Sequence, residues 1–511
     1  MKILDCTIRD GGYYTNWDFE RKTVDTYLRS LNSLPVDYLE VGYRSPDLSG
    51  YHGEFYYCSI STLKYLSENT DKKLAIILNE KDVNPEMVDA LLDPCRDYIH
   101  LVRIAIDPAN FERALILARS IKTKGINVAF NLMYMSKWHE YPKMLDSFGE
   151  LDGIVDYLYL VDSYGSVFPE DVRQLIQRVR NKTKVKLGFH GHNNLEMALA
   201  NTLAAIEEKI DIVDATITGM GRGAGNLSME LLLTVLNRKD DLEVDFNALS
   251  EVTSEFEDLK EHYKWGSSLP YMVSGANSLP QKQVMEWMSK RYYSLNSIIR
   301  ALSNQTKKQK DNSKFPLFQP ANQYDNALII GGGPSAVLHK DALITFLNNN
   351  IETTCVIHAS SKNARVFSEI KNAQFFCLVG NEGVRLEKVF LDFEEFQGQC
   401  ILPPFPRKMG TYVPNILQER TFELSSISFT DIVQDSHTVI ALQAALELGS
   451  KTIYLSGYDG YLENSIERKD QELYIENTEL FNHINDRVRC VSITPTKYSN
   501  LSQSSIYKVN L

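Results

Sequence analysis

The stretch Val185–Asn194 reads VKLGFHGHNN, an apolar run typical of a buried strand that ends in two histidines and two asparagines. Seven further runs of the same kind lie before and after it. They are Lys2–Ile8, Tyr38–Tyr43, Lys73–Leu78, His100–Ile106, Asn127–Leu132, Tyr157–Val161 and Ile212–Thr218. The runs recur roughly every 25–35 residues, which is about the length of one strand–helix unit.

The segments between these runs carry helical patterns. In Phe19–Leu34, for example, Val24, Leu28 and Leu31 mark one face of a helix. Strands that are apolar on both faces are typical of a parallel sheet. Eight strand–helix units therefore predict an α/β fold, a (β/α)8 TIM barrel over residues 1–303. An open doubly wound sheet is the alternative that a strand count leaves open.

A second α/β pattern follows the barrel. Two helical patterns, Phe246–Tyr263 and Gln281–Ser303, precede a polar, lysine-rich segment with two prolines, Asn304–Gln323, which we interpret as a linker. From Asn326 the chain reads ALIIGGGPSA and continues through TTCVIHAS, QFFCLVGN, KTIYLSGYDG and VRCVSIT. This order predicts a smaller Rossmann-like domain over residues 324–511.

The composition excludes several classes of function. The chain has 511 residues, 43% of them hydrophobic and 23% charged, as in ordinary globular proteins. A net charge of -12 and a pI near 5.5 argue against binding to nucleic acid. Seven scattered cysteines without a C-x-x-C pair indicate neither a disulfide framework nor a thiolate zinc site. We find no signal-peptide core and no membrane-spanning run, and therefore expect a cytoplasmic protein.

The catalytic groups of a TIM barrel project from the carboxyl ends of its strands. Here the first predicted strand runs into RDGG (Arg9–Gly12), and the eighth runs into a glycine-rich segment that ends in Asn226. His190 and His192 are two residues apart, so on an extended strand both imidazoles point to the same side. With Asp10 they form a 2-His-1-carboxylate set that can hold a divalent cation. The alternative is a pair of unrelated histidines.

The joint occurrence of TIRDGG, EVGYR, DSYG, GFHGHNN and GRGAGN resembles the hydroxymethylglutaryl-CoA lyase-like family of metal-dependent barrels, and within it the 4-hydroxy-2-oxovalerate aldolases. The resemblance covers about residues 2–300. It implies a metal site formed by Asp10, His190, His192 and Asn226. It also implies that Arg9 stabilises an enolate oxygen and that Glu40 and Asp162 support the site or orient the substrate.

The chemistry of a 2-oxo acid agrees with this resemblance. Such an acid can chelate a divalent cation through its carboxylate and carbonyl oxygens, and the cation then acts as a Lewis acid. Arg9 would add a fixed positive charge where the enolate oxygen develops, unless it only forms a salt bridge to Asp10 or Glu40. We expect a metal-dependent aldolase or lyase that acts on a 2-oxo acid and an aldehyde. Mn²⁺ or Mg²⁺ is the expected ion, and Co²⁺ or Zn²⁺ would also fit.

Two other functions stay open. One is a Claisen-type synthase that condenses an acyl-CoA with a 2-oxo acid on the same barrel. The other is a non-catalytic barrel fused to a glycosyltransferase-like or nucleotide-binding domain. A homo-oligomer is compatible with either function.

One position departs from the aldolases that the barrel resembles. Those enzymes carry a histidine that assists proton transfer just after the Arg-Asp-Gly segment, where this chain has Tyr13 and Tyr14. A phenol with a pKa near 10 is a poor general base at neutral pH, although it can donate a hydrogen bond or a proton. We therefore include Tyr13 among the candidate catalytic residues.

The second domain begins with a glycine-rich turn. Gly331, Gly332, Gly333 and Ser335 follow an apolar strand, where backbone N–H groups can approach a phosphate. GGGPSA and the later segment Ser436–Tyr461 resemble motility-accessory-factor and sialyltransferase-like domains. The resemblance implies a nucleotide or nucleotide-sugar ligand near Ser335, His437 and Asp459, and a place in surface-glycan or sugar-acid metabolism. The alternatives are a merely tight turn and a His437 that only follows a helix N-cap.

Overall fold

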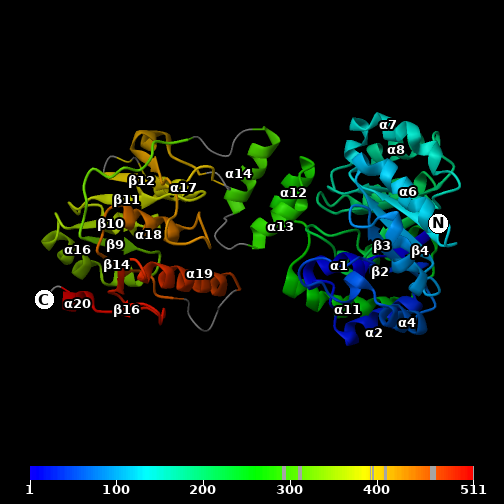
Figure 1. Ribbon diagram of the computed structural model, residues 1–511, viewed down its shortest axis with the longest axis horizontal. Helices are drawn as coiled ribbons and strands as arrows, with labels where there is room; N and C mark the ends of the chain where they lie inside the picture. The colour runs from blue at the N-terminus through cyan, green and yellow to red at the C-terminus, as the bar shows by residue number, and fades with distance from the viewer. Residues whose placement is uncertain are drawn as a thin grey trace. The chain divides into compact units, whose positions relative to one another are not determined.

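The computed structural model describes residues 1–289, 295–308, 314–391, 393, 396–407, 411–460 and 468–509. The chain divides into two compact units, Met1–Met285 and Glu286–Leu511. In Figure 1 the first unit is coloured from blue to green and the second from green to red.

Eight parallel strands of the first unit close into a barrel in the order of the sequence. They are β1 (Lys2–Asp5), β2 (Tyr38–Tyr43), β3 (Lys73–Asn79), β4 (Leu101–Ile106), β5 (Asn127–Leu132), β6 (Tyr157–Asp162), β7 (Lys186–Gly191) and β8 (Ile212–Ala215). Because β1 pairs with both β2 and β8, the sheet has no edge. The predicted TIM barrel is confirmed, and the open doubly wound alternative is wrong for this part of the chain.

Helices surround the barrel strands, as Figure 1 shows for the part of the ribbon around β2, β3 and β4. The longer ones are α2 (Arg21–Asn32), α4 (Ile60–Asn69), α6 (Phe111–Lys122), α8 (Pro169–Arg180), α9 (Ala198–Glu207), α10 (Met229–Asp240) and α11 (Phe246–Tyr263). The apolar stripe of α2, which includes Leu28 and Leu31, packs with strand residues such as Ile76 in the core between strands and helices. A smaller apolar cluster inside the barrel contains Leu4 and Tyr159.

The first strand is shorter than predicted. We expected a strand over Lys2–Ile8, whereas β1 ends at Asp5 and the helix α1 (Thr7–Thr15) begins two residues later. The Asp5 carboxylate accepts hydrogen bonds from the Thr7 N–H at 2.8 Å and the Thr7 hydroxyl at 2.9 Å, which turns the chain out of the sheet. The residues after Asp5 therefore reach the barrel mouth on a helix.

The predicted helix Gln281–Ser303 consists of two helices. They are α13 (Gln281–Ser289) and α14 (Leu295–Thr306), and residues 290–294 between them lie outside the described residues. The helix α14 continues to Thr306, three residues into the segment that we interpreted as a linker. Residues 309–313 of that segment also lie outside the described part of the chain.

The second unit contains an eight-stranded parallel sheet in the order β13-β12-β11-β10-β9-β14-β15-β16. Its strands are β9 (Asn326–Ile330), β10 (Thr354–His358), β11 (Gln374–Cys377), β12 (Gly398–Leu402), β13 (Thr421–Glu423), β14 (Thr452–Ser456), β15 (Arg489–Ser492) and β16 (Ser502–Gln503). The order reverses between β9 and β14, which is the topological switch point of a doubly wound sheet. The predicted Rossmann-like α/β class is confirmed.

Helices cover both faces of this sheet. Leu343 and Phe346 of α16 (Lys340–Asn349) pack on one face, where α20 (Ile506–Val509) adds Ile506. On the other face α18 (His437–Glu447) and α19 (Arg468–Asn485) pack through residues such as Ile440 and Phe481. None of the helices in the described residues combines the length and the apolarity needed to cross a bilayer.

Candidate metal centre

The helix α1 carries two of the predicted site residues, Arg9 and Asp10, in the opening of the barrel. We expected these residues at the end of an extended strand, and this expectation is wrong because α1 already begins at Thr7. The two glycines that follow let this helix lie close to its surroundings. A Cβ atom on Gly11 would lie 2.5 Å from the Met220 sulfur, and one on Gly12 would lie 2.1 Å from the Trp17 ring.

Asp10, His190 and His192 lie together although Asp10 precedes His190 by 180 residues in the chain. One ligand atom from each lies within 4.8 Å of the other two. Nε2 of His190 is 3.7 Å from Oδ2 of Asp10, and the two imidazole rings are 4.9 Å apart. The Asn226 amide donates to Oδ2 of Asp10 at 2.5 Å, and all four side chains are buried. The structure thus brings together the four residues that we predicted as ligands.

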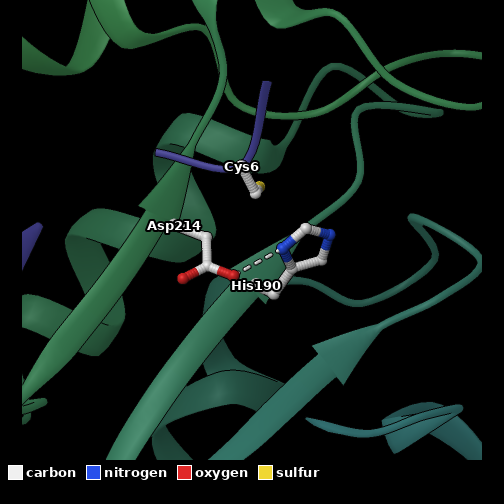
Figure 2. A group of neighbouring side chains, drawn as sticks. All are labelled: Cys6, His190 and Asp214. Atoms are coloured by element: carbon white, nitrogen blue, oxygen red, sulfur yellow. Dashed lines mark hydrogen bonds and ion pairs between the residues drawn. The ribbon is translucent and has the colours of Figure 1, made fainter. Parts of the chain in front are cut away.

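Both histidines are held through their Nδ1 atoms. Nδ1 of His190 lies 2.8 Å from Oδ2 of Asp214, which Figure 2 shows, and Nδ1 of His192 lies 2.8 Å from the backbone oxygen of Asp162. These acceptors fix Nδ1–H as the donor, so each Nε2 is free of its proton and can bind a cation. Burial lowers the pKa of His192 to about 3, and the neighbouring His190 acts in the same direction. Neutral imidazole is the form that binds metals.

The residues present fit a divalent cation. Two imidazole nitrogens and one carboxylate match the 2-His-1-carboxylate arrangement. Burial raises the pKa of Asp10, but Arg9, the two histidines and Asn226 outweigh it and lower the value to about 2, so this carboxylate is ionised. Oδ1 of Asn226 is buried and has no hydrogen-bond partner among the described residues, which leaves it available as a further oxygen ligand.

A second group of three, Cys6, His190 and Asp214, shares His190 with the first (Figure 2). Burial raises the pKa of the Cys6 thiol well above its usual value, and its Sγ lies 3.8 Å from the Ala215 carbonyl oxygen. Asp214 also contacts Arg103, whose NH2 lies 2.5 Å away. Burial raises the pKa of Asp214, but Arg103 and His190 outweigh burial and leave the pKa lowered. A protonated thiol is a poor ligand, so this group supports His190 and does not form a second metal site.

Buried ion pairs connect the ligand Asp10 to Asp214, the residue that holds the ligand His190. Arg9 reaches Asp10 through NH1 at 2.5 Å and Glu40 through Nε at 2.7 Å. Arg103 reaches Glu40 at 3.1 Å and Asp214 at 2.5 Å. We call these five side chains, Asp10, Arg9, Glu40, Arg103 and Asp214, the charge chain. Its three carboxylates and two guanidiniums leave one net negative charge, which favours a bound cation.

Sequence reasoning missed two members of this chain. Arg103 lies in the apolar strand LVRIAI, and Asp214 lies in IVDA. A charge inside an apolar strand that is buried on both faces needs an internal partner, and this signal was present in the sequence. Arg103 also donates to Asn131 at 2.8 Å and lies 4.1 Å above the Tyr159 ring.

Asp162 and Tyr13 occupy different environments. The Asp162 carboxylate accepts backbone N–H groups from Ser166 and Val167, so it closes the turn after β6 and holds His192 only through its backbone oxygen. Burial raises the pKa of Asp162 to about 7. Tyr13 is 36% exposed at the barrel mouth, and its hydroxyl lies 3.3 Å from that of Tyr43.

In the second unit, the glycine turn after β9 lies against β14. Asp459 accepts from the Ser335 N–H at 3.0 Å and from the Ser335 hydroxyl, so these two predicted residues lie together. His437 pairs with a different residue, Glu382, at 3.4 Å. Glu382 also contacts Ser361 and Arg385; burial raises its pKa, but these partners and His437 lower it to about 2. Sequence reasoning missed Glu382.

Gly331 and Gly333 are required for packing, whereas Gly332 is not. A Cβ atom on Gly331 or Gly333 would lie 2.5 or 2.6 Å from the Gly457 oxygen. At Gly332 the nearest atoms would be the Ser360 hydroxyl at 3.7 Å and the Lys362 side chain at 3.9 Å, which are ordinary contacts. The turn therefore keeps two of its glycines for the close approach of β9 and β14.

Known proteins resemble this chain over the barrel. The HMGL-like family model matches residues 100–255. Oxaloacetate decarboxylase of Mycobacterium tuberculosis is 31% identical over 250 residues, which are 47% of this chain and 71% of that protein. A 4-hydroxy-2-oxovalerate aldolase of Bacillus cereus is 29% identical over 272 residues, 50% of this chain and 75% of the aldolase.

A solved structure resembles the first unit. It is the N-terminal domain of a Bacteroides vulgatus protein provisionally described as an aldolase, with 54% sequence identity and a TM-score of 0.57. The match covers 59% of this chain and 100% of that domain. Barrel, site and relatives together define a metal-dependent carbon–carbon lyase. The chain belongs to the HMGL-like family.

Proposed function

We propose that the barrel forms or cleaves a carbon–carbon bond next to the carbonyl group of a 2-oxo acid such as pyruvate, with an aldehyde as the second substrate. The convergence of Asp10, His190 and His192 beside the Arg9 guanidinium is the observation that carries this proposal. In the forward direction the methyl carbon of the 2-oxo acid loses a proton and bonds to the aldehyde carbon, whose oxygen gains a proton. Cleavage is the exact reverse of these steps.

Each residue of the site has a defined task in this reaction. Asp10, His190 and His192 would hold a divalent cation, which would supply Lewis-acid polarisation of the 2-oxo acid's carbonyl. Arg9, fixed between Asp10 and Glu40, holds positive charge beside the oxygen on which the enolate charge develops. Asp214 and the backbone of Asp162 keep both imidazoles in the orientation that binds metal.

We propose Tyr13 as the group that moves a proton at the mouth of the site. Burial raises the pKa of Tyr43 well above its usual value, so its hydroxyl keeps its proton and can donate to the Tyr13 oxygen. A tyrosine held in this way can give its own proton to the alkoxide that forms from the aldehyde. It would replace the histidine of the aldolases that the barrel resembles.

The proposal also extends to the identity of the metal ion, the cellular compartment and the metabolic role. Two imidazole ligands favour Mn²⁺ over Mg²⁺. All seven cysteines are buried and unpaired, which agrees with a reducing cytoplasm. We also propose a role in surface-glycan or sugar-acid metabolism, and only the second domain supports this part of the proposal.

Proton exchange of pyruvate in heavy water tests the barrel reaction. The full-length protein loaded with Mn²⁺ should exchange the methyl protons without any aldehyde, because enolate formation precedes bond formation. The metal-free protein should exchange none above the rate in buffer. If the loaded protein exchanges nothing and instead releases thiol from acetyl-CoA in the presence of a 2-oxo acid, the Claisen alternative holds.

We also propose that the second domain binds a nucleotide or nucleotide-sugar at the switch point of its sheet. The carboxyl ends of β9 and β14 meet there, which is where doubly wound sheets bind ligands. Gly332 faces Ser360 and Lys362, and its missing Cβ leaves room for a phosphate. Gly332→Ala should weaken binding of cytidine or uridine nucleotides, measured by titration calorimetry, without loss of stability.

Gly333→Ala is the contrast for that experiment, because its Cβ would lie 2.6 Å from the Gly457 oxygen and should destabilise the domain. If the wild-type chain binds none of these nucleotides, the nucleotide proposal fails and the barrel proposal is untouched.

A further inference from the structure

Arg222 lies at the mouth of the barrel beside the candidate metal centre. It belongs to the glycine-rich segment between β8 and α10, four residues before Asn226, whose amide donates to Asp10. The guanidinium carbon lies 5.2 Å from the centre of the Tyr13 ring. Its charge is among those that lower the pKa of His192, after burial and His190. Arg222 therefore lies near enough to the metal centre for its charge to act there.

The charge of Arg222 is uncompensated in this structure. The other two arginines of the site, Arg9 and Arg103, each contact two carboxylates. Among the described residues no carboxylate pairs with Arg222, and its Nε is buried without a hydrogen-bond partner. Holding a partly buried guanidinium without an anion costs free energy. A ligand that brings an anionic group to Arg222 would remove this cost.

Besides Tyr13, two tyrosines lie near enough to this guanidinium to be affected by its charge, Tyr134 and Tyr164. Tyr134 and Tyr164 stack with centroids 5.1 Å apart, and Lys137 lies 4.8 Å above the Tyr164 ring. Burial raises the pKa of both tyrosines; Asp107 acts in the same direction and the Arg222 charge opposes it. The carboxylate of Asp107 is engaged with the Ala109 N–H at 3.0 Å. Rings exclude water and strengthen an ion pair formed between them.

We infer that Arg222 binds an anionic group on the aldehyde half of the substrate. This inference rests on the proposed aldol reaction. The cation that Asp10, His190 and His192 would hold would balance the charge of the 2-oxo acid's carboxylate, so that carboxylate does not need this arginine. A guanidinium offers a planar pair of donors that matches either a carboxylate or a phosphate. The acceptor is therefore an aldehyde that carries a carboxylate or a phosphate.

Acceptor preference in the Mn²⁺-loaded, full-length protein tests this inference. Three aldehydes with a two-carbon skeleton separate the possibilities: glycolaldehyde is neutral, glyoxylate carries a carboxylate, and glycolaldehyde phosphate carries a phosphate. Consumption of pyruvate with each gives kcat/KM. Arg222→Gln is the variant, and Arg119→Gln on the outer helix α6 is the control with the same loss of charge at an exposed position.

We expect one anionic acceptor to exceed glycolaldehyde by about 10²-fold in kcat/KM, as a hydrogen bond to a charged group implies. Arg222→Gln should abolish this preference, whereas Arg119→Gln should keep it. Both variants should exchange pyruvate protons at the wild-type rate and hold wild-type amounts of metal. The acceptor that loses its advantage identifies the anion as carboxylate or phosphate.

Three outcomes would overturn the inference. The wild-type protein could prefer the neutral acceptor, Arg222→Gln could retain the preference, or Arg222→Gln could raise the KM for pyruvate in the exchange reaction. The last result would assign Arg222 to the carboxylate of the 2-oxo acid. Absence of exchange in the wild-type protein would instead reject the proposed aldol reaction, so the two failures are distinguishable.

Discussion

Arg9 and Arg103 contact the same carboxylate oxygen of Glu40, Arg9 through Nε at 2.7 Å and Arg103 through NH1 at 3.1 Å. Glu40 is thus the midpoint of the charge chain that runs from Asp10 to Asp214. All three side chains are buried, so neither arginine can turn to water if the carboxylate is removed.

Glu40→Gln should lower the free energy of unfolding by about 3 kcal/mol, because it leaves two buried cations without their shared anion. Denaturant unfolding of the metal-free protein measures this change. Glu251→Gln is the matched control, since its carboxylate pairs with Arg29 at the surface and should cost less than about 1 kcal/mol. Equal costs for both variants would contradict a structural role for the charge chain.

Asp214→Asn should weaken metal binding by about 10- to 100-fold, because a neutral amide no longer fixes Nδ1–H of His190 as the donor. Competition with a chelator of known affinity measures the change. The variant also deprives Arg103 of a partner, so unfolding of the metal-free protein must be measured alongside. An unchanged metal affinity in a destabilised protein would limit Asp214 to supporting the fold.

Tyr13→Phe should slow the complete aldol reaction by about 10²-fold, the usual contribution of a proton donor. Tyr14→Phe is the adjacent control, because its hydroxyl is engaged with the Gly223 carbonyl at 3.2 Å and with Tyr271. Exchange of pyruvate protons separates two tasks of Tyr13. A loss in exchange as well places it at enolate formation, and equal rates for both variants would remove it from the mechanism.

Asp5 should make the stability of the protein depend on pH. Burial raises the pKa of its carboxyl from 3.8 to about 7 in the folded state, so the folded protein holds this proton more tightly than the unfolded chain. The resulting stabilisation is complete below about pH 4 and is lost as the pH rises to 7. Asp5→Asn cannot titrate and should lack this loss.

The free energy of unfolding of Asp5→Asn relative to the wild type should therefore rise between pH 4 and 7, by at most about 1.4 kcal/mol per pH unit. Denaturant unfolding in the presence of a chelator measures it without a contribution from metal binding. Parallel profiles for the two proteins would show that the Asp5 carboxyl titrates normally.

The sequence predicted the metal ligands better than it predicted the buried charged residues that hold them in place. His190 and His192 were recognisable because two residues of the same kind, two apart at the end of an apolar strand, face the same side. Arg103 and Asp214 were not recognised, because one charge in an apolar strand has no visible partner until the barrel brings β4 and β8 within reach. Pairing across 111 residues leaves no local pattern in the chain.

The ends of helices and strands also differ from those that the sequence pattern predicts. Thr7 and Ile8 have strand-forming side chains, yet they belong to α1 because the Asp5 carboxylate captures the Thr7 N–H and hydroxyl. Such a hydrogen bond depends on a side-chain rotamer and not on periodicity. In the second unit the strand pattern predicted the sheet but not the contact between Glu382 and His437. These two residues come together only through the order of the strands in the sheet, which the pattern does not give.

The pairing of β1 with β8 sets the order in which a growing chain can acquire its metal site. Asp10 leaves the ribosome 216 residues before Asn226, to which it is hydrogen-bonded. Closing a loop of this length has a large entropic cost that only the completed barrel offsets. A nascent chain that stops before β8 thus carries Asp10, His190 and His192 but leaves β1 without its second neighbour. Metal capture is therefore a late event in the synthesis of this protein, coupled to closure of the barrel.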